Sequence, residues 1–327
     1  MTYEFDPELA VHVPGLPRLP FDDLAKARAL EAELAAADTL PDGCPPLDVH
    51  DTDVPGGAGR PDVPVRLYLP SGRPRRRGAL LYLHPGGFAL GGIRSSDVDA
   101  TLLAAGADVV VLSVDYRLAP EHPFPSALVD CAAALRWLVA HADALGVDPD
   151  RIGLAGESAG GNIAAALALL NRDHEGPAIR GQFLFSPVLD DRLATASATR
   201  FTDTPFWDRA NAEHCWDHYL GGPGVRGGRS VSAYAAPARA ADLAGLPPVY
   251  LSVCEYDPAR DEALAYGLRL LHAGVRGELH LFPGTFHAST LLRDAAVSVR
   301  MSQDRQRAVK ELLRPLQLEA VTGEANS

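Results

Sequence analysis

The chain has 327 residues, 47% of them apolar, and a formal net charge of −12. This length can bury a substantial core in one large domain, or in one domain with an insertion. The acidic balance argues against nucleic acid as a partner. The four cysteines are scattered without a C-x-x-C pair, and neither a signal peptide nor a run of 18 apolar residues is present, so we expect a reduced, cytoplasmic protein with no zinc site and no membrane contact.

The predicted elements begin after a proline-rich stretch over residues 1–20, which we expect to be irregular. Apolar spacing then predicts a helix over 21–37 and a short strand over 47–50. From residue 63 onward, strands alternate with helices. The expected strands are 63–69, 79–83, 108–114, 151–155, 181–185, 248–254 and 278–282, and the expected helices are 127–141, 159–171, 261–273 and 291–313. This alternation predicts a mainly parallel sheet covered on both faces.

Residues 190–240 interrupt the alternation with aromatic side chains among Asp, Pro and Gly. We expect an insertion between two core strands that, with the N-terminal segment, covers an edge of the sheet. The expected division is an N-terminal cap segment over 1–45, a core in two parts over 46–189 and 241–327, and a cap insertion over 190–240. Phe206 and Trp207 of the insertion are candidate residues of a substrate pocket.

The segment Gly156-Glu157-Ser158-Ala159-Gly160 matches the pattern G-x-S-x-G between a predicted strand and a predicted helix. That setting is a nucleophile elbow, a tight turn whose flanking residues must be small and whose serine has a strained backbone. The positive end of the following helix points at the serine. We therefore predict that Ser158 is a nucleophile. The alternative is that Ser158 only caps the helix.

A second motif, His84-Pro85-Gly86-Gly87-Phe88, follows the predicted strand over 79–83. Acyl transfer needs convergent backbone N–H donors about 3 Å from the developing oxyanion, and glycine lets the backbone approach that closely. Gly86 and Gly87 are the expected donors, with the amide of Ala159 as a third. The alternative is an ordinary tight turn.

Together, these motifs resemble the hormone-sensitive lipase-like family of bacterial α/β-hydrolase esterases. The resemblance spans roughly residues 63–314 and includes the segments 84–88, 115–121, 156–162, 256–261 and 286–287. It implies an α/β-hydrolase fold, with a mainly parallel central sheet flanked by helices and a helical cap built from the N-terminus and an insertion. It also implies that His84 organises its loop rather than acting as a base. Phe88 is a further candidate for the pocket wall.

The chain departs from the family pattern at two places. Pro85 stands where family members commonly carry glycine, and proline has no N–H, but the expected donors are at positions 86 and 87. Ala288 and Ser289 stand where the family usually has Gly-Phe after the catalytic histidine. The second departure leaves the shape of the nearby pocket wall open.

Eleven histidines compete for the role of general base. In this fold the order along the chain is serine, then acid, then histidine, and the base follows the last core strand. His287 fits this position, whereas His280 lies inside the strand and His272 lies in a helix. The resemblance selects Asp257 as the acid that orients the base. Pure helix capping by Asp257, and Asp261 as the acid instead, are the alternatives.

The expected reaction is hydrolysis of short-chain carboxylic esters through a Ser158–His287–Asp257 triad and an acyl-enzyme, with no metal and no organic cofactor. The expected partner is a small-molecule ester. Family members are often homodimers, although the sequence identifies no interface. One alternative is deacetylation of an acetylated metabolite by the same machinery. Another, of a different class, is a non-catalytic ligand-binding receptor of the same fold, but His287 is present where such a receptor has lost its histidine.

Overall fold

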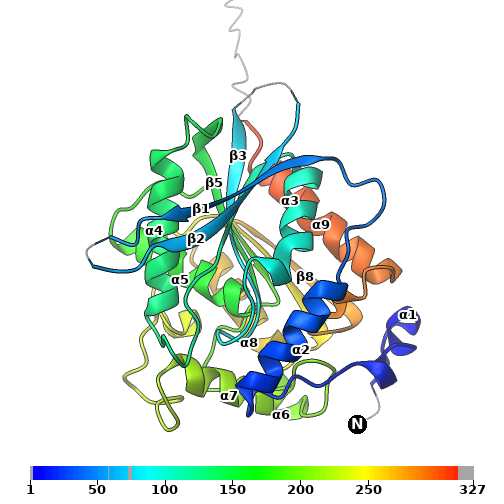
Figure 1. The fold of residues 1–327 in the computed structure, drawn as a ribbon. Helices are drawn as coiled ribbons and strands as arrows, with labels where there is room; N and C mark the ends of the chain where they lie inside the picture. The colour runs from blue at the N-terminus through cyan, green and yellow to red at the C-terminus, as the bar shows by residue number, and fades with distance from the viewer. Residues whose placement is uncertain (1–2, 58, 73–75, 316–327) are drawn as a thin grey trace, which may run out of the picture.

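The computed structural model describes residues 3–57, 59–72 and 76–315. Its centre is an eight-stranded sheet in the order β1-β2-β4-β3-β5-β6-β7-β8 (Figure 1). The strands are β1 Leu47–Val54, β2 Val63–Pro70, β3 Arg77–Leu83, β4 Val110–Val114, β5 Val147–Glu157, β6 Gly181–Phe185, β7 Val249–Tyr256 and β8 Gly277–Phe286. β2 runs antiparallel to β1 and β4, and all other neighbouring strands are parallel. The predicted mainly parallel sheet is confirmed.

The central strands are apolar without interruption, which suits strands covered on both faces. Every residue of β4 and of β6 is buried, whereas β1 at the edge of the sheet is mostly exposed. β5 and β8 run further than expected, to Glu157 and Phe286. As a result, Ser158 and His287 follow directly on strand ends.

The helices are α1 Pro7–Ala10, α2 Leu24–Ala37, α3 Asp97–Ala107, α4 Ser126–Ala140, α5 Ala159–Asp173, α6 Ala196–Arg200, α7 Arg209–Tyr219, α8 Arg260–His272 and α9 Ala296–Leu312. α3 and α9 pack together on one face of the sheet, and α4, α5 and α8 cover the other (Figure 1). The short helix α1 occurs within the stretch that we expected to be irregular. α3, α6 and α7 are absent from the predicted set.

Two segments far apart in the sequence lie together at one end of the sheet (Figure 1). α1 and α2 belong to the N-terminal segment, and α6 and α7 to the chain between β6 and β7. A backbone bridge joins Arg18 to Phe206, and the rings of Phe21 and Trp207 meet edge-on with centroids 5.7 Å apart. His218 Nε2 lies 3.1 Å from the carbonyl oxygen of Phe21. The N-terminal segment is therefore held against the inserted one.

The cysteines and other metal-ligating side chains are dispersed. All four cysteines are free, and three of them are buried. Within the described ranges, no group of three or more His, Cys, Asp or Glu side chains is placed to hold a metal ion. Over the same ranges, no helix combines the length and the apolar character needed to cross a membrane.

Candidate active site

Ser158 occupies the tight turn between β5 and α5. Its backbone has φ +56° and ψ −116°, a conformation that residues with side chains rarely adopt. A Cβ on Gly156 would lie 2.3 Å from the Gly160 backbone, and a Cβ on Gly160 would lie 2.0 Å from the carbonyl oxygen of Leu83. Ser158 is the N-cap residue of α5, but its side chain makes no capping hydrogen bond. The turn has the geometry of a nucleophile elbow, and the hydroxyl is free for another partner.

The Ser158 hydroxyl stands at one end of a line of three hydrogen-bonded side chains. His287 Nε2 is 2.8 Å from Ser158 Oγ, and His287 Nδ1 is 2.6 Å from Asp257 Oδ2. Because a carboxylate only accepts, the imidazole donates from Nδ1, which leaves Nε2 to accept the serine proton. All three side chains are buried, and Trp207 stacks on the imidazole with ring centroids 5.2 Å apart. The structure thus brings together the three residues predicted as a triad.

Asp257 combines the two roles considered for it in the sequence. Its Oδ1 accepts a hydrogen bond from the backbone N–H of Ala259 at 2.8 Å, while Oδ2 faces His287. Asp261 lies in the first turn of α8, where it pairs with Arg260 at 2.8 Å and accepts from the backbone N–H of Ser197. The carboxylate that reaches the imidazole is therefore that of Asp257, and Asp261 pairs with an arginine.

Burial and charge act in opposite directions on His287. Burial, the largest single effect, lowers the pKa of the imidazole. The charge and hydrogen bond of Asp257, with a smaller contribution from Glu157, outweigh it and raise the pKa above its ordinary value of 6.5. A raised pKa makes the imidazole a stronger base toward the serine proton, which suits general-base chemistry near neutral pH.

The loop after β3 presents free backbone amides beside the triad. Gly86 and Gly87 line the same cavity as Ser158, with φ values of +125° and +57°. A Cβ on Gly86 would lie 2.2 Å from the carbonyl oxygen of Leu90, so the turn requires glycine there. The amides of Gly86, Gly87 and Ala159 donate to no acceptor among the described residues. Three N–H groups are thus available to a ligand oxygen.

His84 is buried behind this loop. Its ring stacks on Tyr116 with centroids 4.0 Å apart, and the Tyr116 hydroxyl donates to the His84 carbonyl at 2.7 Å. His84 Nδ1 donates a hydrogen bond to the carbonyl oxygen of Pro85 at 2.7 Å, so Pro85 contributes an acceptor to the loop although it has no N–H. Burial lowers the pKa of His84 to about 4, which keeps the ring neutral at neutral pH. These contacts fit a residue that organises the loop.

Glu157, immediately before the nucleophile, was not among the predicted site residues. It is buried and forms two bonds of 3.1 Å with Arg305 of α9. Arg305 in turn lies over the ring of Phe185, 4.4 Å from its centroid. The two charges act on the His287 pKa in opposite directions. The sequence showed only that an acidic residue stands inside the G-x-S-x-G pattern. It could not show the pairing of Glu157 with Arg305, because the two residues are 148 positions apart.

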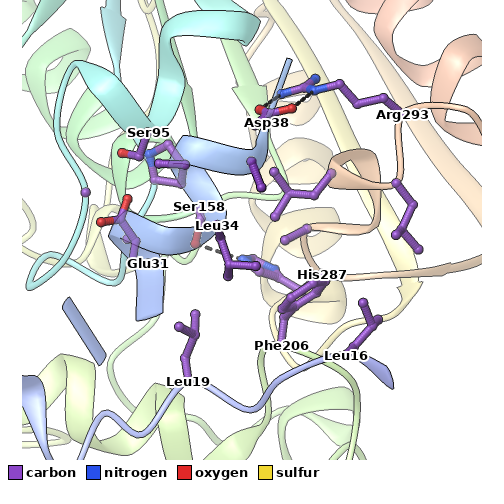
Figure 2. A pocket seen from close by; sticks show the side chains of 18 of the residues that line it. Leu16, Leu19, Glu31, Leu34, Asp38, Ser95, Ser158, Phe206, His287 and Arg293 are labelled. Atoms are coloured by element: carbon purple, nitrogen blue, oxygen red, sulfur yellow. Dashed lines mark hydrogen bonds and ion pairs between the residues drawn. The ribbon is translucent and has the colours of Figure 1, made fainter. Parts of the chain in front are cut away.

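A cavity of about 660 Å³ opens beside Ser158 and His287 (Figure 2). Its walls come from the N-terminal segment, the loop after β3, the insertion and the segment after His287. The predicted pocket residues Phe206 and Trp207 line it. Phe88 does not: it is buried, with its ring stacked on Tyr219 at a centroid distance of 3.9 Å. Contrary to the prediction, Phe88 supports the loop from behind, because the chain turns there at φ +64°.

The departure at Ala288 has a steric consequence. Ala288 has φ +63°, in the left-handed region where glycine has no penalty. An alanine in this conformation costs about 1–2 kcal/mol relative to glycine. Ala288 lines the cavity, and its neighbour Ser289 is buried with its carbonyl accepting from Ser298 at 3.0 Å. Ala288 is therefore the first residue of this pocket wall, which continues with Leu291 and Leu292.

Comparison with known sequences gives consistent matches along the chain. A family model described as alpha/beta hydrolase fold matches residues 80–291. Carboxylesterase NlhH of Mycobacterium tuberculosis is 38% identical over 284 residues, 87% of this chain and 88% of that relative. Esterase LipI of the same species is 41% identical over 238 residues, 72% of this chain and 73% of that relative.

Solved structures show the same similarity in three dimensions. Bacterial Heroin Esterase has a TM-score of 0.91 at 46% identity, covering 95% of this chain and 99% of that one. Esterase LipW from Mycobacterium marinum has a TM-score of 0.85 at 39% identity, covering 95% and 97% of the two chains. The chain therefore belongs to the hormone-sensitive lipase-like family of α/β-hydrolase esterases.

Proposed function

We propose that this protein is a serine carboxylesterase that hydrolyses short-chain acyl esters through an acyl-enzyme. The observation that carries the proposal is the hydrogen-bonded line Ser158–His287–Asp257 at the wall of a cavity that free backbone amides also reach. Relatives named as carboxylesterase and esterase support the reaction class. A receptor that only binds its ligand has no need of a histidine within hydrogen-bond distance of the serine.

In the first half of the reaction, Ser158 Oγ attacks the ester carbonyl carbon while His287 Nε2 takes the hydroxyl proton. Asp257 holds the imidazole in the tautomer that accepts at Nε2 and stabilises the imidazolium that forms. The amides of Gly86, Gly87 and Ala159 stabilise the negative oxygen of the tetrahedral intermediate. The imidazolium then gives its proton to the leaving alkoxide oxygen, the C–O bond breaks, and the alcohol departs.

In the second half, water takes the place of the alcohol. His287 removes a proton from this water as it attacks the acyl carbon. The second tetrahedral intermediate collapses, the bond to Ser158 Oγ breaks, and the proton returns from His287 to the serine. The products are a carboxylic acid and the free enzyme, so the chemistry balances with the side chains and amides already named.

The aromatic side chains of the insertion limit the length of the acyl chain in this proposal. Phe206 and Trp207 are buried side chains of the cavity wall. Each buried methylene of a substrate gains about 0.8 kcal/mol until the chain meets a wall, after which steric cost dominates. We propose residues 1–45 and 190–240 as the cap that builds this wall. A relative named Ethyl acetate hydrolase, from Pseudomonas putida, supports a preference for small esters.

Labelling with a serine-directed organophosphorus reagent, followed by peptide mass spectrometry, tests the nucleophile. We expect one adduct, on Ser158, together with loss of esterase activity. Ser158→Ala should lower kcat by several orders of magnitude, because only binding and the amide donors remain. The absence of an adduct would favour a binding protein, and more than about a tenth of the activity in Ser158→Ala would remove Ser158 from the mechanism.

A series of p-nitrophenyl esters from two to sixteen acyl carbons tests the length limit separately. We expect kcat/KM to be highest at eight carbons or fewer. A maximum beyond twelve carbons would contradict the proposed wall and leave the esterase assignment intact. Trp207→Ala should move the maximum toward longer chains if the wall is where we propose.

A further inference from the structure

One carboxylate of the cavity has no role in the proposed ester chemistry. Glu31 of α2 lines the cavity together with Leu34 and Ala35 of the same helix and with its C-cap residue Asp38. Positions 31, 34, 35 and 38 are spaced three, four and seven residues apart, so they form the inward stripe of α2. Figure 2 shows Glu31 and Leu34 projecting from this helix, with Ser95 beside Glu31. Glu31 is thus a charged group at a position where an inward helix face is normally apolar.

Glu31 Oε1 is buried and has no hydrogen-bond partner among the described residues. Burial raises the pKa of the carboxyl, and a hydrogen bond from Ser95 offsets this only in part. A buried acceptor without a donor destabilises a folded protein, and more so when the acceptor is charged. A donor brought by a ligand would satisfy this oxygen.

In the part of the chain that the structure describes, no ion pair joins Glu31 to an arginine or a lysine. Among the described residues that line the cavity, Arg293 is the one with a permanent positive charge, and Asp38 and Asp99 already bind it at 2.5 and 3.0 Å. Arg28, one turn before Glu31 on α2, is bound by Glu121 at 2.7 Å. The cavity also includes Asp42 and Asp294. Its charge balance therefore favours a cationic ligand.

We propose that Glu31 is a specificity-determining residue that binds a protonated amine of the substrate, so that the enzyme prefers amine-bearing esters to neutral esters of the same shape. This inference rests on the proposed esterase function. The ammonium N–H donates to Glu31 Oε1 while the ester carbonyl lies at Ser158 in the same cavity. A charge-assisted hydrogen bond of this kind in a partly buried site is strong enough to change kcat/KM by about tenfold or more.

Matched ester pairs measure this preference. In one pair the amine is in the alcohol half: 2-(dimethylamino)ethyl butyrate against 3-methylbutyl butyrate. In the other it is in the acyl half: ethyl 4-(dimethylamino)butanoate against ethyl 5-methylhexanoate. Within each pair a protonated nitrogen replaces a C–H group at nearly constant shape. We define the amine preference as kcat/KM for the amine ester divided by kcat/KM for its neutral partner, so that general effects on the enzyme cancel.

We expect an amine preference of about tenfold or more in at least one pair for the wild-type enzyme. Glu31→Gln should reduce that preference toward one, because the amide keeps the shape and removes the charge. Glu33→Gln is the matched control. Glu33 is exposed on the same helix, so this substitution removes the same charge at a position outside the cavity. It should retain the wild-type preference.

Several results would overturn the proposal. They are a preference near or below one in both pairs of the wild type, an unchanged preference in Glu31→Gln, or an equal fall in Glu33→Gln, which would indicate general attraction by the acidic protein. Hydrolysis of the neutral esters shows that each variant is folded and active. If the wild type hydrolyses the neutral esters without an amine preference, only this inference fails. If it hydrolyses none of the four, the proposed esterase function fails with it.

Discussion

At Ser158 the chain adopts a strained backbone so that one hydroxyl projects from a turn lined by glycine. Sterics determine this arrangement, partly within the five residues of the turn and partly against the end of β3, where the carbonyl oxygen of Leu83 approaches Gly160. What makes the hydroxyl reactive is less local, because it depends on the protonation state of His287 and on the carboxylate behind it.

The first prediction concerns the pH dependence of the reaction. His287 must be neutral to accept the serine proton, and its pKa lies above the ordinary 6.5 because Asp257 outweighs the effect of burial. We therefore expect kcat/KM for an uncharged ester to rise with pH, with its midpoint above 6.5. The raised pKa of His287 also stabilises the folded state at pH values below the pKa that this histidine has in the unfolded chain. This stabilisation disappears as the pH rises through the pKa of His287 in the folded protein. A midpoint below pH 6 would show that burial prevails.

The second prediction separates the two acidic candidates. Asp257→Asn should lower kcat by about 10³–10⁴, because an amide no longer holds the imidazole in the accepting tautomer. Asp261→Asn should act mainly on stability, by about 1 kcal/mol, because Asp261 pairs with Arg260 and the backbone of Ser197. Steady-state kinetics and thermal unfolding of both variants measure the two effects. The reverse ranking would make Asp261 the orienting acid.

At the scale of elements, α2 is attached to the core in its first half and at its end. Arg28 donates to the carbonyls of Ala89 and Ala119, which belong to the segments after β3 and β4. Asp38, the C-cap residue of α2, is bound by Arg293 from the segment after His287. The inward stripe of α2 is therefore held against both the loop of free amides and the segment of the base.

Replacement of Arg293 tests this attachment. Arg293→Met leaves Asp38 and Asp99 facing each other without their shared cation. We therefore expect the free energy of unfolding to fall by about 1–3 kcal/mol, which is less than for a fully buried ion pair because these side chains are partly exposed. Thermal unfolding should show a fall of several degrees, and hydrogen exchange should rise across residues 24–38. Arg276→Met, at an exposed arginine, is the control. An equal fall in both variants would mean that Arg293 does not anchor α2.

Two of the helices that were missed from the sequence, α3 and α7, differ in how they are buried. α3 buries side chains on several sides, including Val98, Ala100 and Leu103, so no single apolar stripe marks it. α7 mixes aromatic and charged residues because it packs on the loop after β3 on one side and is exposed on the other. Periodicity detects helices with one buried face, and α3 departs from that pattern. α7 does have one buried face, at positions 211, 212, 215, 216 and 219, but this stripe includes the polar Asn211 and is interrupted in the sequence by charged residues.

At the scale of the whole molecule, the site is a product of strand direction. The loop of free amides follows β3, Ser158 follows β5, Asp257 follows β7 and His287 follows β8. These strands run parallel, so their carboxyl ends meet at one edge of the sheet. Ser158 and His287, which are 129 positions apart, are thereby brought within hydrogen-bond distance. Gly86 and His287, about 200 positions apart, line one cavity. Residues of α2 and of the chain between β6 and β7 then line the cavity at that edge.

The sequence by itself determined the features that depend on neighbours along the chain. These are the strand–turn–helix around Ser158, the glycine loop at 86–87, the alternation that specifies a parallel sheet, and the position of His287 after the last strand. Short-range sterics and hydrophobic periodicity are encoded locally, so they can be read without a fold.

Only the tertiary structure decided what depends on contacts between distant segments. It joined Asp257 to the imidazole, paired Glu157 with Arg305, turned Phe88 away from the cavity and left Glu31 Oε1 without a hydrogen-bond partner among the described residues. Each outcome depends on which side chains meet after the chain has packed. Sequence spacing does not predict such contacts between distant side chains, because the energy of a buried charge or ring depends on the groups that surround it in the folded protein.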